Sequence, residues 1–425
     1  MCTDVAQRPF AGGARGLTVR EVGKTFGMHA VDAVAPSAVG ENIALLRKTR
    51  DLSQRALATR ARISLSLLSK IEIGDRACRP AVAAAIANAL GVHVSEVYGQ
   101  PYAEAPDSEL ITALRSAVRR HRHPSVSDVR ERQLPADIAH ASRLRSETRY
   151  SDLLRILPDL LSRAVAHAHD SGEPEAWQML VDAYACAWTI AHRLGYPDLA
   201  DLIAARQEWA ASRHSTPVAL LGAAWSESGC FQSAGDYLEG LAVTDRALAG
   251  VAARDLDDVD ALVAVGSLHL RAVALAGRAR DAGTVDHHLS HARRLAERMP
   301  GKGDHYRHNL TFGPGNVLLH ELAVHVELDR PRKAVAMAAG LADARLPGLQ
   351  PTRLGHLHID TARAHLADGN RDASLESLLR AREVAPQMAR IHPMSREVLR
   401  VLVSLHRRSR PELAGLAKWA GLPRA

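Results

Sequence analysis

The sequence has few of the residues that build strands, covalent scaffolds or membrane spans. Aromatic residues are only 4% of the 425, and because aromatic and β-branched side chains favour strands, this composition argues against an all-β fold. No CxxC pair indicates a zinc knuckle or a disulfide framework. No window reaches about 18 uninterrupted apolar residues, and no leader of basic and then apolar residues is visible. We therefore expect a cytoplasmic protein without a membrane span. The four cysteines are Cys2, Cys78, Cys186 and Cys230.

Motifs of common enzyme and metal sites are missing as well. The chain has no GxxxxGK[ST] loop, no GxGxxG after a strand and no GxSxG elbow. His287 and His291 lie one helical turn apart, but no third ligand stands at a matching spacing, so an exposed surface is favoured over a metal pair. His320 and His325 are about 140° apart around a helix, whereas the histidines of a zinc-protease helix share one face. We expect no enzyme activity, no metal and no cofactor.

What the sequence does contain is helix-forming residues and positive charge. Hydrophobic residues make up 47% and charged residues 24%, which is typical of a folded soluble protein. The net charge of +7 permits a polyanionic partner without requiring one. We predict an all-α fold with a flexible glycine-rich arm (residues 1–36), a compact unit (37–100), a linker with connecting helices (101–150) and a long helical region (151–425).

The compact unit of residues 37–100 reads as five short helices separated by tight turns. Ser53 and Ser64 stand where helix N-caps are expected, and Pro80 stands in the first turn of the fourth helix. Gly74 is placed to end the third helix. The apolar residues of each segment recur at helical spacing, which predicts a shared core for the five helices.

Leu-Ser-Gln opens the second helix of this unit and Ile-Glu-x-Gly closes the third. With these motifs, residues 40–99 resemble the phage-repressor-type helix-turn-helix family, also called XRE. The resemblance implies that residues 64–72 enter the DNA major groove while residues 53–60 cross the backbone. It assigns DNA contacts to Gln54, Ser64, Leu65, Ser66, Ser69, Lys70, Arg76 and Arg79.

Three further positions follow from the same resemblance. Arg47 and Glu72 match a partly buried ion pair that holds the first helix to the third. Arg62 stands where the family usually has glycine, so we expect either a strained positive φ or a slightly different turn. Leu65 replaces a polar residue at a base-reading position, which leaves contact with a thymine methyl group as its specific interaction.

Beyond residue 150, amphipathic helices are punctuated by short breaks. The breaks fall at residues 194–198, 228–230, 275–278, 328–331 and 367–370. Gly195 and Gly229 are 34 residues apart, and the later steps are about 40 to 50. Residues 355–373 follow the order of small residue, apolar residues, turn and alanine. The region resembles the tetratricopeptide family, whose helix pairs stack into a superhelix with a concave ligand-binding face.

Two groups of side chains in this region are candidates for a ligand site. Trp177, Tyr184 and Trp188 lie near one helical face, where a core between repeats is favoured over an apolar wall for a ligand. Polar side chains recur at helical spacing further along, and either a solvated surface or a ligand accounts for them. The tentative ligand-binding residues are Asn316, His320, Arg353, His356, Asp360 and Arg363.

The complete layout resembles XRE regulators of the actinobacterial type that carry a C-terminal tetratricopeptide-like domain. It is also similar to bacterial peptide-pheromone receptors, although their Asn-rich peptide clamp is not evident. The resemblance implies a sequence-specific transcriptional regulator that binds a double-stranded operator as a homodimer, because one helix-turn-helix reads only a few base pairs. Its helical array would dimerise and bind a small-molecule or peptide effector. The alternatives are a DNA-tethered scaffold for a protein partner and, for the N-terminal unit, a bundle whose Lys70 and Arg76 are merely solvated.

Overall fold

Helices form almost all of the regular structure in the described part of the chain, alongside one two-stranded hairpin. The prediction of an all-α fold is therefore confirmed. The arm expected over residues 1–36 lies outside the described residues, as does the proline-containing stretch 101–106. The computed structural model describes residues 39–100, 107–122, 133–214, 216–251, 258–341, 346–405 and 410–422.

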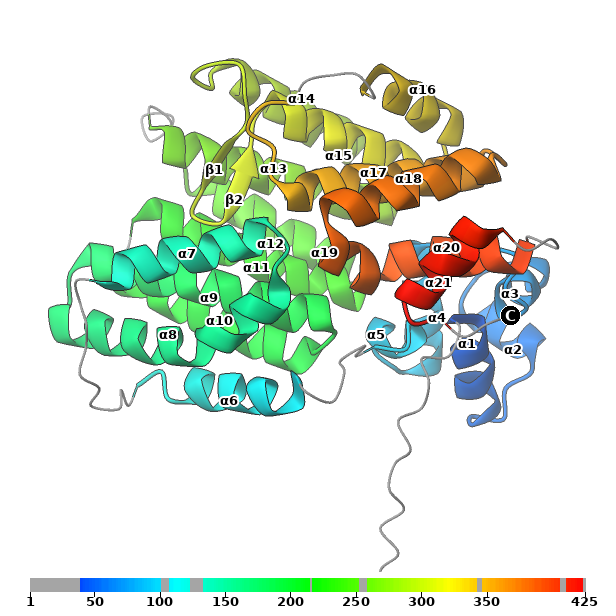
Figure 1. Cartoon of the computed structure of the whole chain (residues 1–425), viewed down its shortest axis with the longest axis horizontal. Helices are drawn as coiled ribbons and strands as arrows, with labels where there is room; N and C mark the ends of the chain where they lie inside the picture. Colours follow the sequence, from blue (N-terminus) through cyan, green and yellow to red (C-terminus); the bar gives the residue numbers. More distant parts are fainter. Residues whose placement is uncertain are drawn as a thin grey trace, which may run out of the picture. The chain divides into compact units, whose positions relative to one another are not determined.

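Five short helices form the N-terminal domain, and local sequence signals set their ends. The Ser53 hydroxyl accepts a hydrogen bond from the Ala56 N–H, and the Ser64 hydroxyl accepts one from Leu67, each at 3.1 Å. Pro80 stands in the first turn of the fourth helix. The predicted caps are thus confirmed. The helices are α1 (Val39–Lys48), α2 (Gln54–Arg60), α3 (Leu65–Glu72), α4 (Pro80–Leu90) and α5 (Val94–Val97) (Figure 1).

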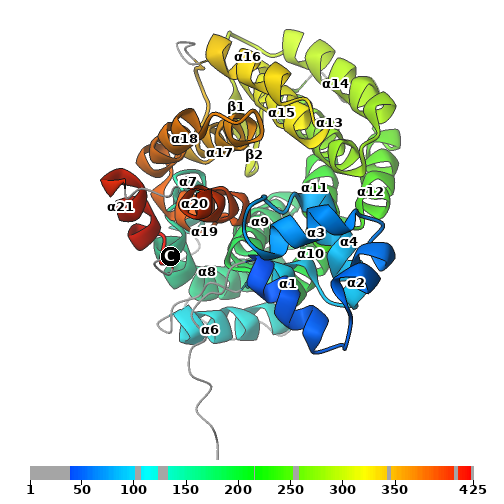
Figure 2. The same cartoon turned by 90° about the vertical axis from the view of Figure 1, so that its right-hand side faces the viewer.

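The remaining described residues form helix pairs joined by short turns. Each helix packs on its neighbours, for example α9 on α8 and α10, and α13 on α12 and α14. Figure 2 shows α11 to α18 following one another around a curve. The expected helical-repeat array is therefore present. Its elements are α6 (Asp107–Arg119), α7 (Leu134–Ser146), α8 (Tyr150–Ser171), α9 (Pro174–Leu194), α10 (Pro197–His214), α11 (Pro217–Ala234), α12 (Tyr237–Ala249), α13 (Val259–Ala279), α14 (Ala282–Glu297), β1 (His305–Arg307), β2 (Leu310–Phe312), α15 (Pro314–Glu327), α16 (Pro331–Leu341), α17 (Pro351–Ala367), α18 (Arg371–Val384), α19 (Pro386–Ile391), α20 (Pro393–Leu405) and α21 (Pro411–Trp419).

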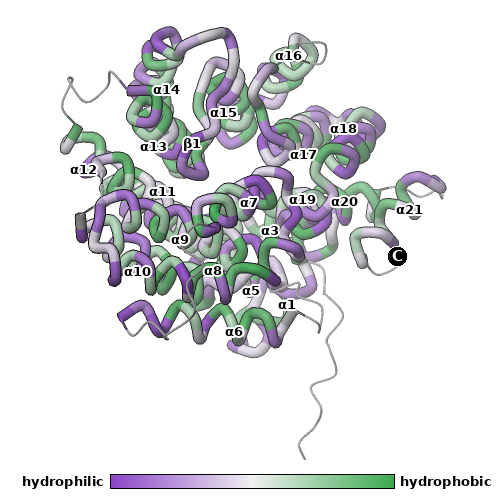
Figure 3. Tube along the Cα trace, turned by 60° about the vertical axis from the view of Figure 1, so that its left-hand side comes forward, coloured by the Kyte–Doolittle hydropathy of each residue, from purple (hydrophilic) through white to green (hydrophobic). Residues whose placement is uncertain are grey.

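The core of the N-terminal domain continues into the repeats. Hydrophobic and hydrophilic residues alternate along the helices in Figure 3, as amphipathic helices require. One cluster of buried apolar side chains includes Ile43 and Leu57 of the N-terminal domain together with Leu180 of α9 and Met388 of α19. Burial of apolar surface therefore fastens the N-terminal domain to the array.

Two of the expected helix breaks are wrong. α11 runs straight through residues 228–230 and ends only at Gly235, so the step from Gly195 is 40 residues, not 34. Close packing, not a turn, requires glycine at position 229, because a Cβ there would lie 2.6 Å from the Trp188 ring. α13 likewise continues past residues 275–278 and ends at Arg280. The breaks at 194–198, 328–331 and 367–370 are confirmed.

Two glycines at helix ends lie directly against the N-terminal domain. Gly195 ends α9 with φ of 82°, and Gly235 ends α11 with φ of 93°. A Cβ on Gly235 would lie 2.5 Å from the Cβ of Ala84 in α4. A Cβ on Gly195 would lie 2.6 Å from the Cβ of Gln100. Both positions therefore combine a left-handed backbone with close approach of another element.

Among the described helices, α13 alone is long and apolar enough to cross a membrane. However, 78% of its apolar window is buried inside the fold. It packs against α11, α12, α14 and α15. This burial is what a central helix of a repeat array shows, because its neighbours cover it on several sides.

The segment between α14 and α15 contains the hairpin. β1 and β2 pair antiparallel, with His305 opposite Phe312. Phe312 is fully buried against α13, where a Cβ on Gly266 would collide with its ring. Each strand has three residues, which is too short for a period of two to be recognised in the sequence.

The turn of the hairpin carries His308, whose imidazole lies between two carboxylates. Its Nδ1 is 3.0 Å from Oδ2 of Asp182 on α9, and its Nε2 is 3.3 Å from Oδ2 of Asp260 on α13. The hydrogen bond with Asp182 raises the pKa of His308 to about 9, with Asp260 adding to the effect and burial opposing it. The protonated imidazole therefore ties the hairpin to two helices.

This arrangement predicts a pH-dependent contribution to stability. Because the folded pKa exceeds the unfolded value, the contribution is fully present below about pH 6.5 and is lost as the pH rises through about 9. Between about pH 6 and about pH 8 it should fall by about 2 kcal/mol. The free energy of unfolding of the wild type and of His308→Gln, measured at both pH values, isolates this contribution from other histidines. An equal pH dependence in the two proteins would contradict the prediction.

Candidate DNA-binding surface and interior cavity

The third helix buries one face and exposes the other. Leu68 and Ile71 are buried in the core of the domain, whereas Leu65 remains 38% exposed. The outward face of α3 is therefore open to a partner. Of the residues predicted to contact DNA, Ser64, Leu65, Ser66, Lys70 and Arg76 are exposed, while Gln54, Ser69 and Arg79 are partly exposed.

The turn before α3 contains a residue in the left-handed region. Arg62 has a φ of 53°, so the first of the two conformations considered for this position is the one adopted. The backbone N–H of Ile63 donates to the carbonyl of Ala58 at 3.0 Å, which closes the end of α2. The turn thus keeps its geometry with arginine in place of glycine, at a cost of about 1 to 2 kcal/mol.

An ion pair fixes α3 to α1. Nε of Arg47 donates to Oε1 of Glu72 at 2.8 Å, and Nη2 donates to Oε2 at 3.0 Å. This confirms the expected pair. Gln54 Nε2 donates to the same carboxylate at 2.8 Å. Burial alone would raise the pKa of Glu72, but the hydrogen bonds from Arg47 and Gln54 lower it below its ordinary value. Gln54, one of the predicted DNA contacts, thus uses one N–H donor within the domain.

The segment after α3 contacts the helical array. Nη2 of Arg79 donates to Oδ1 of Asp329, which follows α15, at 2.7 Å. The backbone N–H of Cys78 donates to Oε1 of Glu397 on α20, also at 2.7 Å. Arg79, one of the predicted DNA contacts, is therefore paired with a carboxylate of the array in this arrangement.

We predict that Asp329→Asn strengthens DNA binding. The substitution removes the charge that pairs with Arg79, while asparagine tolerates the positive φ of this position. A partly exposed ion pair contributes about 0.2 to 1 kcal/mol, so the affinity should rise by about 1.4-fold to fivefold. Fluorescence anisotropy with labelled DNA measures this effect. Asp368→Asn is the matched control, because Asp368 pairs with the exposed Arg332. Equal affinities of the two variants would refute the prediction.

A cavity of about 290 Å³ lies between the N-terminal domain and the array. His93, Ser95 and Tyr98 at α5 contribute to one side of it, and α9, α11, α13, α15 and α17 contribute most of the rest. A volume of this size is at the lower end of the range for small-molecule sites. All six tentative ligand-binding residues line the cavity, namely Asn316, His320, Arg353, His356, Asp360 and Arg363.

Hydrogen bonds hold three of these six residues together. Arg353 donates from Nε to Oδ1 of Asn316 at 2.9 Å and from Nη2 to Nε2 of His320 at 3.0 Å. Asn316 in turn donates from Nδ2 to the carbonyl of Thr311 in β2 at 2.7 Å. The hairpin thus positions the Arg353 side chain through Asn316.

A second group forms an ion-pair network at the cavity wall. Arg363 donates from Nη1 to Asp360 at 2.8 Å and from Nη2 to Glu327 at 2.9 Å. Burial alone would raise the pKa of Glu327, but the charges of Arg363 and Arg278 lower it. Since each charge here has an opposite partner, this network holds α15 to α17.

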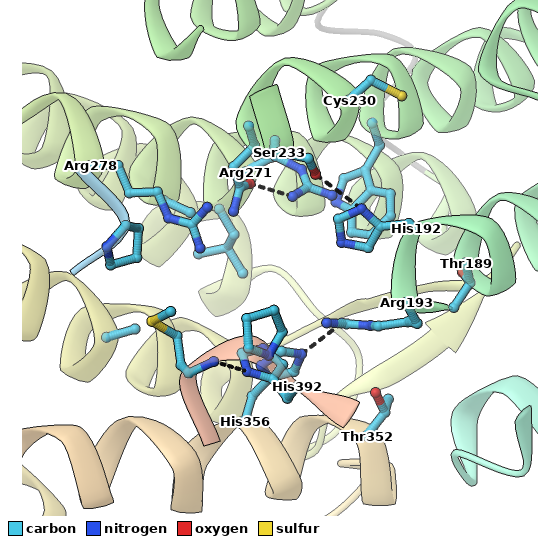
Figure 4. Close-up of a pocket in the computed structure, with 18 of the residues that line it drawn as sticks. Thr189, His192, Arg193, Cys230, Ser233, Arg271, Arg278, Thr352, His356 and His392 are labelled. Atoms are coloured by element: carbon cyan, nitrogen blue, oxygen red, sulfur yellow. Dashed lines mark hydrogen bonds between the residues drawn. The ribbon is translucent and has the colours of Figure 1, made fainter. Parts of the chain in front are cut away.

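The residues on the other half of the cavity wall are not predicted from the sequence. Arg193 of α9 and Arg271 of α13 extend toward the same space as His356 and His392 (Figure 4). Trp188 also lines the cavity, while it is largely buried against its neighbours. Helical periodicity places residues on a face but cannot tell which faces of distant helices meet. In the sequence, the net positive charge is the one general indication that basic side chains gather somewhere in the fold.

Three histidines in the middle of α14, His287, His288 and His291, cluster with His269 of α13. The ring of His291 lies 5.0 Å from that of His269 and 4.6 Å from that of His287, measured between centroids. His288 is buried and its Nδ1 is 3.0 Å from Nδ1 of His269. In the described ranges no group of three or more His, Cys, Asp or Glu side chains is placed to hold a metal ion.

Comparison with known proteins is informative for the N-terminal domain. None of the curated protein sequences matches this chain. A solved complex of Bacillus thuringiensis PlcR with the peptide PapR7 and DNA shares 14% identity, covers 61% of this chain and 95% of its own, and has a TM-score of 0.30. A PrgX/iCF10 complex shares 9% identity, covers 78% and 97%, and has a TM-score of 0.29. Residues 38–97 match the helix-turn-helix domain family. This part of the chain is therefore a helix-turn-helix domain.

Proposed function

We propose that the protein is a cytoplasmic, sequence-specific DNA-binding transcriptional regulator of the XRE family, of the actinobacterial type. The observation that carries this proposal is the match of residues 38–97 to a helix-turn-helix domain whose third helix presents an exposed outer face. An α-helix is the element that fits the major groove, and phosphate contacts from basic residues such as Arg76 fix its register.

The regulator acts as a homodimer whose helical array binds a small-molecule or peptide effector. A single helix-turn-helix reads only a few base pairs, so two copies on a two-fold related operator supply useful specificity. The cavity beside the N-terminal domain supports the effector, because a ligand there would contact both parts of the chain. Such a ligand regulates DNA binding only if it prefers one arrangement of the two parts.

Binding of purified full-length protein to a library of random double-stranded DNA tests this function. We expect enrichment of a two-fold related sequence with half-sites about one helical turn apart, and a dimer in sedimentation. Lys70→Ala should relax the base preference. Arg76→Ala should weaken binding to all sequences alike and reduce the salt dependence by about one phosphate contact. A protein that binds no DNA, or binds without sequence preference, would overturn the proposal. Co-purification of a protein partner without any effect of cell extract on DNA binding would indicate a scaffold.

A further inference from the structure

The interior cavity has an excess of positive charge. Six arginines and three carboxylates line it. The carboxylates Glu327 and Asp360 lie in the network around Arg363, with Arg278 Nε 4.0 Å from Glu327. The other four arginines form no ion pair within the part of the chain that the structure describes, namely Arg145, Arg193, Arg271 and Arg353.

Arg271 shows how these arginines are held. Its Nη1 donates to Oε1 of Gln232, and its guanidinium lies over the ring of Trp225, 3.9 Å from the centroid. Its Nε is buried and has no hydrogen-bond partner. A buried polar group without a partner is costly unless another molecule satisfies it. The aromatic ring and Gln232 orient this guanidinium but leave part of its hydrogen-bonding capacity unused.

The neighbouring arginines also have neutral partners. Arg193 donates from Nη2 to Nε2 of His356 at 2.9 Å, and Arg353 donates to Asn316 and His320 as described above. Burial holds the pKa of both His320 and His356 well below its ordinary value, with nearby arginines adding to the effect. These histidines are therefore neutral and do not add to the charge, but they also do not neutralise it.

The guanidinium groups are close enough to affect one another. Burial, and then the charges of Arg278, Arg193 and Arg353, lower the pKa of Arg271 to about 9. Burial and the charge of Arg193 lower the pKa of Arg353 to about 10, although the charges of Asp360 and Asp304 partly oppose this shift. Both values are above neutral pH, so the groups remain cationic while repelling each other. An anion placed among them would relieve this repulsion.

We propose that the cavity binds an anionic small molecule whose carboxylate or phosphate group is held by Arg193, Arg271 and Arg353. The planar guanidinium fork matches both kinds of anion with paired hydrogen bonds. Trp188 and Trp225 line the same cavity and supply an apolar surface for the body of the molecule. The role of this molecule as an effector rests on the proposed function, whereas its binding does not.

Binding is tested with full-length protein in the absence of DNA. The probes are 2-naphthoate as a carboxylate, inorganic pyrophosphate as a phosphate and 2-naphthamide as the neutral counterpart, all at constant ionic strength. Saturation is followed by tryptophan fluorescence, because Trp188 and Trp225 line the cavity, and by the shift in Tm. We expect at least one anion to saturate and to raise Tm, and naphthoate to bind at least about tenfold more tightly than naphthamide. Which probe saturates shows whether the cavity takes a carboxylate or a phosphate group. Absence of binding by both anions, or binding of naphthamide as tightly as naphthoate where naphthoate saturates, would overturn the proposal.

Variants locate the binding site. Arg271→Gln and Arg353→Gln should each weaken binding of the anion at least about tenfold, and Arg271→Lys should retain part of the affinity because it keeps the charge. Arg294→Gln is the matched control, since Arg294 is exposed on α14. Unliganded Tm and circular dichroism establish that each variant is folded. Folded variants that bind the anion as tightly as the wild type would reject the site. A protein that binds DNA but no anion rejects this proposal alone, and one that binds the anion but no DNA rejects the regulator.

Discussion

Replacing Ser66 with glutamate is expected to lower the affinity for operator DNA at least about 100-fold without unfolding the protein. Ser66 is exposed on the outer face of α3, so the longer side chain meets no steric obstacle in the free protein. Bound to DNA, a carboxylate at this position would face the phosphates that border the major groove. Juxtaposed like charges cost several kcal/mol at an interface, and a 100-fold loss corresponds to about 2.7 kcal/mol.

Fluorescence anisotropy at physiological salt measures this loss on the operator selected from the random library. Ser212→Glu is the matched control, because Ser212 is exposed on α10 and is not part of the helix-turn-helix domain of residues 38–97. The control adds the same charge to the protein and should change the affinity by no more than a few-fold. If both variants lost the same affinity, α3 would not be the element that reads DNA.

The substitution with the largest expected effect on stability is Glu72→Ala. It leaves the guanidinium of Arg47, whose side chain is only 11% exposed, without its carboxylate partner. Removing one member of a buried pair costs about 3 to 5 kcal/mol. The contribution also depends on pH. Because the folded pKa of Glu72 is lowered, the stabilisation is present at neutral pH and is lost as the pH falls through that lowered pKa.

Hydrogen exchange of the amides in α1 to α3 measures this effect locally. A local measurement is needed because the N-terminal domain and the array need not unfold in one step. Glu383→Ala is the control, because the pair of Glu383 with Arg380 is exposed on α18 and should contribute less than about 1 kcal/mol. The double substitution Arg47→Met and Glu72→Leu should recover much of the loss, since no charge remains unpaired. Equal effects of Glu72→Ala and Glu383→Ala would show that the pair does not stabilise the domain.

The N-terminal domain could be predicted closely because its signals are local. Ser53, Ser64 and Pro80 act on backbone groups within a few residues of themselves, and the ion pair of Arg47 with Glu72 follows from the family pattern. By contrast, the pairing of Arg79 with Asp329 joins residues 250 positions apart. No periodicity or motif connects such residues, so their contact became visible only in three dimensions.

In the array, too, contacts between residues far apart in the sequence could not be predicted. Glycine is a poor helix former, so Gly229 predicts a helix break, but the residue packs against the ring of Trp188, a partner that the sequence does not identify. For the cavity, the spacing of Arg353 and His356 predicted a shared polar face on α17. Arg193 and Arg271 lie on α9 and α13, and only the curvature of the array brings them to that face.

Gly195 and Gly235 have a consequence for how the two parts of the chain can diverge. In an ordinary repeat, only the left-handed backbone conformation restricts the residue that ends a helix, so asparagine can replace glycine at modest cost. At these two positions a side chain would also collide with Gln100 or Ala84. A substitution of either glycine is therefore tolerated only together with a compensating change in the N-terminal domain. A transplanted array without that domain would be released from this double restriction.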